Sequence, residues 1–85
     1  MKVWLGRLGY HEHRGRTGDI SYVRRLGGLA YPRFHLYLDQ THDGLALKLH
    51  LDEKQPSYVG HTAHSGQYDG ELVQAEMARI VASVQ

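Results

Sequence analysis

Hydrophobic and polar residues alternate most regularly between Arg33 and Asp52, in the stretch RFHLYLDQTHDGLALKLHLD. The apolar positions of the two runs are Phe34, Leu36, Leu38, Leu45, Leu47, Leu49 and Leu51. Side chains of a strand point alternately to its two faces, so the pattern predicts two strands that each have one apolar and one polar face. Asp43 and Gly44 lie between the runs and tolerate the backbone angles of a tight turn. We therefore expect a β-hairpin.

The alternation leaves two registers open for this hairpin. In one register, His35 lies opposite His50. In the other, His35 lies opposite Asp52, and the opposite charges of Asp39 and Lys48 are paired. Both registers keep the leucines on one face, so the pattern alone does not choose between them.

Three segments precede the hairpin. Residues 20–26, ISYVRRL, are rich in β-branched and aromatic residues and predict a strand. Residues 2–10 also have the composition of a strand, although two glycines weaken it. Between them, residues 11–19 read HEHRGRTGD, and these polar residues and glycines predict a loop.

The C-terminal segment, residues 71–84, has the periodicity of a helix. Its apolar stripe consists of Val73, Met77, Ile80, Val81 and Val84. Asp69 is suited to cap the N-terminus of this helix. Residues 53–70 show no sustained period, and connections of this length tend to be functional.

Together these segments predict an α+β fold, in which one C-terminal helix packs on one face of a small antiparallel sheet of three or four strands, a β-meander. A chain of 85 residues predicts a single domain over residues 1–85. It contains no cysteine, which excludes disulfides and thiolate metal sites. No apolar run approaches the roughly 20 residues that cross a bilayer, and the N-terminus does not have the pattern of a signal peptide. We therefore expect a cytoplasmic protein without a membrane partner.

Charge is divided unevenly along the chain. Residues 1–38 carry seven basic and two acidic side chains, whereas residues 39–85 carry three and seven. Arginines bind phosphates, and aromatic rings stack on unpaired bases, so the basic half favours nucleic-acid binding. The candidate residues are Arg14, Arg16, Tyr22, Arg24, Arg25, Arg33 and Tyr37. No RNA-recognition, KH or helix-turn-helix signature accompanies them, and solvated arginines are the alternative interpretation.

Histidine is unusually frequent, with seven in 85 residues. Neutral imidazole is a common ligand of zinc, copper, nickel and iron. The pairs that favour a zinc-type divalent metal are His11 with His13 and His61 with His64. His35 and His50 form a third pair if they are cross-strand neighbours, and Asp52 or Asp69 could add a carboxylate. No pair has the spacing of a known zinc motif, and histidines that bond to the backbone or lie on a solvated face are the alternative.

Catalysis has weaker support. Ser57 and Ser65 lie near His61 and His64 in the sequence, but no nucleophile-elbow motif is present. We therefore expect a small non-enzymatic binding module that contacts nucleic acid, RNA in particular, through its basic N-terminal half and an open sheet face. The alternatives are a histidine-liganded metal-binding domain and a homodimeric or protein-interaction module, since a second copy would enlarge a thin core.

Overall fold

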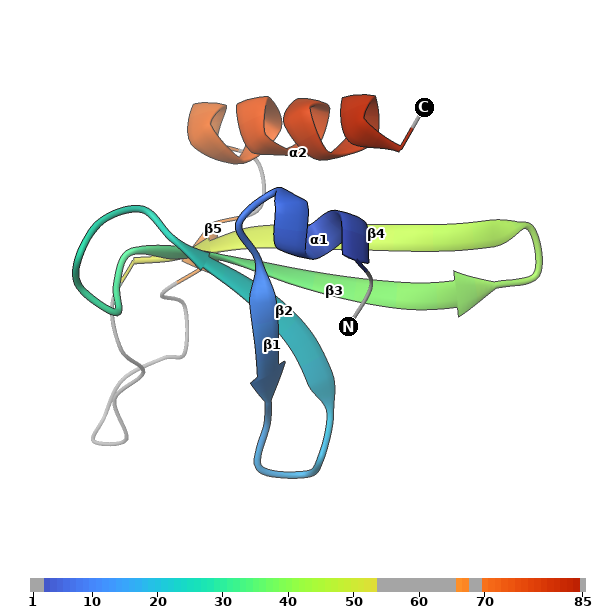
Figure 1. Ribbon diagram of the computed structural model, residues 1–85, viewed down its shortest axis with the longest axis horizontal. Coiled ribbons are helices and arrows are strands. Elements are labelled where there is room, and N and C mark those ends of the chain that lie inside the picture. The colour runs from blue at the N-terminus through green and yellow to red at the C-terminus, as the bar shows by residue number, and fades with distance from the viewer. Residues whose placement is uncertain (1–2, 54–65, 68–69, 85) are drawn as a thin grey trace.

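A computed structural model of the chain describes residues 3–53, 66–67 and 70–84 and has an antiparallel sheet with a helix on one face (Figure 1). The strands are β1 (His11–Arg14), β2 (Ile20–Arg25), β3 (Arg33–Thr41), β4 (Gly44–Asp52) and the short β5 (Gly66–Gln67), and they are neighbours in that order. The helices are α1 (Val3–Arg7) and α2 (Glu71–Ser83). The predicted α+β fold, a meander with a C-terminal helix, is confirmed. Neither α1 nor α2 has the length and apolar composition needed to cross a membrane.

The predicted hairpin is formed by β3 and β4, which pair along their whole length. Thr41 pairs with Gly44 across a two-residue turn, and Gly44 has a φ of 143°, which favours glycine. This tight turn selects the first of the two registers, so His35 lies opposite His50. The register that would place Asp39 opposite Lys48 is not formed.

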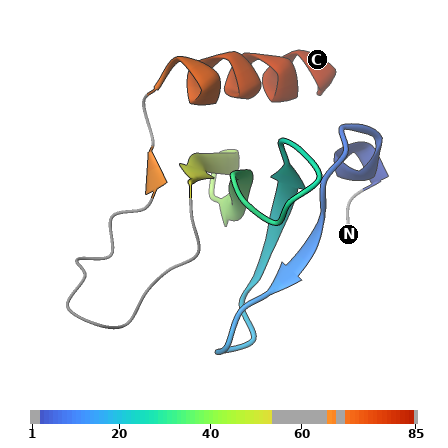
Figure 2. The same cartoon turned by 90° about the vertical axis from the view of Figure 1, so that its left-hand side faces the viewer.

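The apolar face of the sheet carries the core, and α2 lies across it (Figure 2). The buried core residues are Leu5, Tyr10, Phe34, Leu36, Leu49, Leu51, Val73 and Ile80. Val73 and Ile80 are seven residues apart on α2 and therefore lie on the same side of the helix. The leucines of β3 and β4 therefore contribute to the core, as their alternation predicts, except near the turn, where Leu45 is 42% exposed.

Two N-terminal predictions are wrong. Residues 3–7 form α1 instead of a strand, and this helix stops where Gly9 adopts a φ of 97°, a conformation typical of a glycine at a helix end. Residues 11–14, predicted as a loop, form β1 and pair with β2. This strand lies at the edge of the sheet, where charged and polar side chains are tolerated.

The helix α2 is where residue periodicity predicts it, but two details differ. Its N-cap is Gly70 instead of Asp69, and no side chain caps it. Val81 and Val84 are 36% and 52% exposed, whereas Glu76 is only 4% exposed. The buried stripe is therefore centred on Val73, Glu76 and Ile80.

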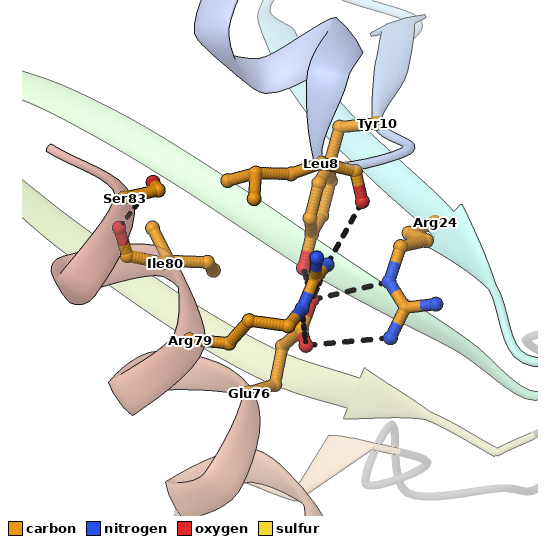
Figure 3. Close-up of polar contacts among 7 residues, drawn as sticks. All are labelled: Leu8, Tyr10, Arg24, Glu76, Arg79, Ile80 and Ser83. Carbon is orange, nitrogen blue, oxygen red and sulfur yellow. Dashed lines mark hydrogen bonds and ion pairs between the residues drawn. The ribbon is translucent and has the colours of Figure 1, made fainter.

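Glu76 is buried because three donors surround its carboxylate (Figure 3). The hydroxyl of Tyr10 and Arg24 Nε donate to Glu76 Oε2 at 2.6 and 3.1 Å, and Arg79 Nε donates to Glu76 Oε1 at 2.8 Å. Burial acts to raise the pKa of Glu76, but the hydrogen bonds from Arg79, Arg24 and Tyr10 outweigh it and lower this pKa to about 2. Arg79 also donates to the carbonyl of Leu8 at 2.8 Å. This polar cluster therefore connects α2 to β2 and to the segment that follows α1.

Candidate metal centre on the polar sheet face

The sheet face opposite α2 carries the polar residues of the hairpin. The β1–β2 hairpin extends to the side away from α2 (Figures 1 and 2), and its residues His13 and Ser21 lie on the same face as His35. We expected this face to be open, yet Ser21, His35 and Asp52 are only 3%, 7% and 8% exposed. The face therefore contains a buried polar cluster.

The carboxylate of Asp52 is the centre of this cluster. Its Oδ2 atom lies 3.0 Å from His35 Nδ1, and its Oδ1 atom lies 3.1 Å from His50 Nδ1. Arg33 Nε donates to the same Oδ2 atom at 3.2 Å. His50 and Asp52 are two residues apart on β4 and therefore share a face, while the register brings His35 opposite His50. One carboxylate is thus placed between two imidazoles.

These three side chains fit a small divalent metal. Their ligand atoms all lie within 4.8 Å of one another. A tetrahedral zinc site has ligand atoms about 3.3 Å apart, since zinc–nitrogen and zinc–oxygen distances are about 2.0–2.2 Å. The oxygen–nitrogen distances of 3.0 and 3.1 Å are close to this spacing, but they involve the two different oxygens of Asp52, so the imidazoles must turn toward a shared ion for it to bind. Two imidazoles and one carboxylate are also a donor set that leaves coordination positions open.

Ser21 holds the far side of the His35 ring. Its Oγ atom lies 2.7 Å from His35 Nε2, and its hydroxyl also has the backbone carbonyl of His13 as an acceptor, at 3.4 Å. The Ser21 hydroxyl can accept from Nε2–H while it donates to the His13 carbonyl, and with this tautomer a metal would take the place of the proton that lies between His35 Nδ1 and Asp52. A metal ligand needs that tautomer, and metal-bound histidines are commonly oriented by such a hydrogen bond. Ser21 therefore suits the outer shell of a metal site.

Ser21, His35 and Asp52 also have the order of a serine-nucleophile triad. Two observations weigh against that chemistry. Ser21 is only 3% exposed, so an acyl group has little access to its hydroxyl, and the second imidazole, His50, has no role in a triad. Metal binding uses both imidazoles and the carboxylate.

Burial and neighbouring charges set the charge states of the cluster. Burial lowers the pKa of His50, an effect that the carboxylate of Asp52 opposes and the positive charge of Arg33 reinforces. Burial acts to raise the pKa of Asp52, but the hydrogen bond from His35 and the charges nearby outweigh it and lower this pKa. A neutral imidazole and an ionised carboxylate are the forms that bind metals.

Ring contacts fix the orientation of the imidazoles. The Tyr37 ring stacks on His35 with centroids 4.5 Å apart and on His50 with centroids 5.7 Å apart. His13 meets His35 edge-on, with centroids 5.5 Å apart. These contacts orient imidazoles that come from β1, β3 and β4.

The structure places the predicted metal ligands differently from the sequence analysis. His13 flanks the cluster, His11 is exposed on β1, and neither is among the three grouped residues. His61 and His64 lie outside the described residues. The structure brings His35 next to His50, and the sequence identifies this pair only if the register of the hairpin is known. The Asp43-Gly44 pair did not indicate this register, because a two-residue turn of Asp43 and Gly44 would pair His42 with Leu45, whereas the observed turn consists of His42 and Asp43.

The predicted nucleic-acid residues are divided between the two faces. Arg25, Arg33 and Tyr37 lie on the face of the metal cluster, whereas Tyr22 and Arg24 lie on the face that α2 covers. Arg14 shares the strand face of Tyr22, and Arg16 lies between β1 and β2. These residues therefore do not form one continuous basic surface, and nucleic-acid binding stays a prediction.

Comparisons of the chain with protein-family models, with curated proteins and with solved structures each found no match. The chemistry of the cluster is therefore the basis for a functional proposal.

Proposed function

We propose that this protein binds a zinc-type divalent metal through His35, His50 and Asp52. The observation that carries the proposal is the position of one carboxylate within 3.0 and 3.1 Å of two imidazole nitrogens. This proposal keeps the chemistry that the histidine content predicts but assigns it to ligands on β3 and β4.

The scaffold supports a site of defined geometry. All three ligands lie on two strands that pair from Arg33 with Asp52 to Thr41 with Gly44. Sites on paired strands are held more rigidly than sites on loops, and metal binding depends on that preorganisation. Ser21 and Tyr37 restrict the His35 ring further.

The donor atoms narrow the class of metal. Imidazole nitrogen with one carboxylate suits zinc and neighbouring first-row metals such as cobalt, nickel and iron. Calcium and magnesium bind mainly oxygen ligands and fit this set less well. A site of this kind also accounts for more of the observed geometry than nucleic-acid binding does, because the candidate arginines lie on two faces.

Native mass spectrometry of the purified chain, before and after EDTA, tests the proposal. We expect one zinc per chain that EDTA removes, together with a rise in melting temperature when zinc is added back. His50→Gln should abolish stoichiometric binding, whereas His42→Gln in the exposed β3–β4 turn should not. Equal zinc uptake by wild type and His50→Gln would refute the assignment.

A further inference from the structure

A hollow of about 500 Å³ lies beside the cluster, over the outer half of the β3–β4 hairpin. Its lining residues are Tyr37, Leu38, Asp39, Ala46, Leu47, Lys48 and His50. His50 belongs both to this hollow and to the proposed metal centre. A molecule in the hollow therefore has access to the edge of that centre.

The metal centre supplies the first attraction for a ligand. A site with three protein ligands keeps at least one coordination position for water or a bound molecule. An oxygen anion is the natural occupant of that position on a zinc-type ion.

Lys48 supplies a second attraction. It is two residues from His50 on β4, which places their Cα atoms about 6.6 Å apart on the same side of the strand. Among the residues that the structure describes, Lys48 takes part in no ion pair. Its flexible side chain can therefore direct its ammonium group toward an anion at the metal.

Tyr37 and Asp39 restrict the rest of the ligand. Tyr37 is 37% exposed, and its ring continues the stack of His35 and His50, so it offers a surface for a planar or apolar group. The carboxylate of Asp39, also in the lining, repels additional negative charge. The lining thus favours a ligand with one anionic group and no further negative charge.

We propose that this hollow binds a small organic acid, whose single oxyanion group bridges the metal and Lys48 while its planar or apolar body packs on Tyr37. The inference rests on the proposed metal site. The shared chemistry is that of a carboxylate or a phosphate, and the repulsion by Asp39 favours a monoanionic carboxylate.

Cobalt-loaded protein provides the test, because a ligand that enters the coordination sphere changes the visible spectrum of cobalt. We expect saturable changes with benzoate, weaker changes with phenyl phosphate, and no change with neutral benzamide. Lys48→Gln should weaken benzoate binding at least about 10-fold with an unchanged cobalt content. Asp39→Asn should strengthen phenyl phosphate binding relative to benzoate.

The outcomes separate the two proposals. Stoichiometric cobalt without any benzoate response would overturn the ligand site and leave the metal site standing. Equal benzoate affinity in wild type and Lys48→Gln would overturn the bridging arrangement. Failure to bind cobalt at His35, His50 and Asp52 would overturn the proposed function itself.

Discussion

The Nδ1 atom of His35 lies 3.0 Å from the Oδ2 atom of Asp52, although the two residues are not direct cross-strand partners. His35 pairs with His50, and Asp52 pairs with Arg33, so the contact runs diagonally across the hairpin. The diagonal leaves His50 room to approach the other carboxylate oxygen. The metal proposal depends on this arrangement of two imidazoles around one carboxylate.

Removing the carboxylate should weaken metal binding. We expect Asp52→Asn to lower zinc affinity at least about 10-fold, because an amide oxygen is a weaker, uncharged ligand. Competition with a chromophoric chelator measures the change. Asp39→Asn, an exposed substitution on the same strand face, is the matched control and should leave zinc affinity within about twofold of wild type. Equal losses in the two variants would point to a general effect of charge.

Removing the Ser21 hydroxyl should weaken the site from its outer shell. We expect Ser21→Ala to reduce zinc affinity about 10–100-fold, since the ring of His35 loses the partner that fixes its tautomer. Ser21→Thr keeps a hydroxyl and should retain most of the affinity. Imidazole ¹⁵N shifts of His35 provide a readout that a purely structural loss would not move. Unchanged shifts and affinity in Ser21→Ala would show that the 2.7 Å contact has no part in metal binding.

Neutralising Glu76 should destabilise the fold without affecting metal binding. Glu76→Gln leaves Arg24 and Arg79 without their buried partner, and disruption of such a pair costs roughly 3–5 kcal/mol. Urea unfolding measures the free energy. Glu71→Gln, at an exposed position of the same helix, should cost less than about 1 kcal/mol. A loss in Glu76→Gln no larger than that of the control would contradict the account of the core.

The same carboxylate predicts acid sensitivity. The pKa of Glu76 is about 2 in the folded protein, against an ordinary value of 4.5. A lowered folded-state pKa stabilises the fold above the unfolded pKa, and this stabilisation of about 3 kcal/mol is lost as pH falls from about 5 toward 2. The difference in unfolding free energy between wild type and Glu76→Gln should therefore shrink over that interval. A difference independent of pH between 5 and 2 would argue against a charged Glu76.

Local sequence patterns predicted the helix and strands that have strong periodicity. They missed features that depend on contacts between residues far apart in the sequence. The hairpin follows from alternation between Arg33 and Asp52, and α2 follows from its apolar spacing. The burial of Glu76 depends on Tyr10 and Arg24, which are 66 and 52 residues away in the sequence. No local pattern contains that information.

The metal cluster was predictable only in part, for a related reason. The histidine content indicated imidazole ligands, and one of the two hairpin registers placed His35 opposite His50. The choice between registers depends on the geometry of the turn that precedes Gly44. No sequence pattern indicated the contact between Ser21 and His35, because this contact requires β2 to pair with β3.

A crystal structure of the zinc-loaded protein, with an anomalous difference map at the zinc absorption edge, tests the central claim most directly. The account predicts one strong peak about 2.0–2.2 Å from His35 Nδ1, His50 Nδ1 and an oxygen of Asp52. A map with no peak at these three atoms, or with zinc bound only at other histidines, would contradict it.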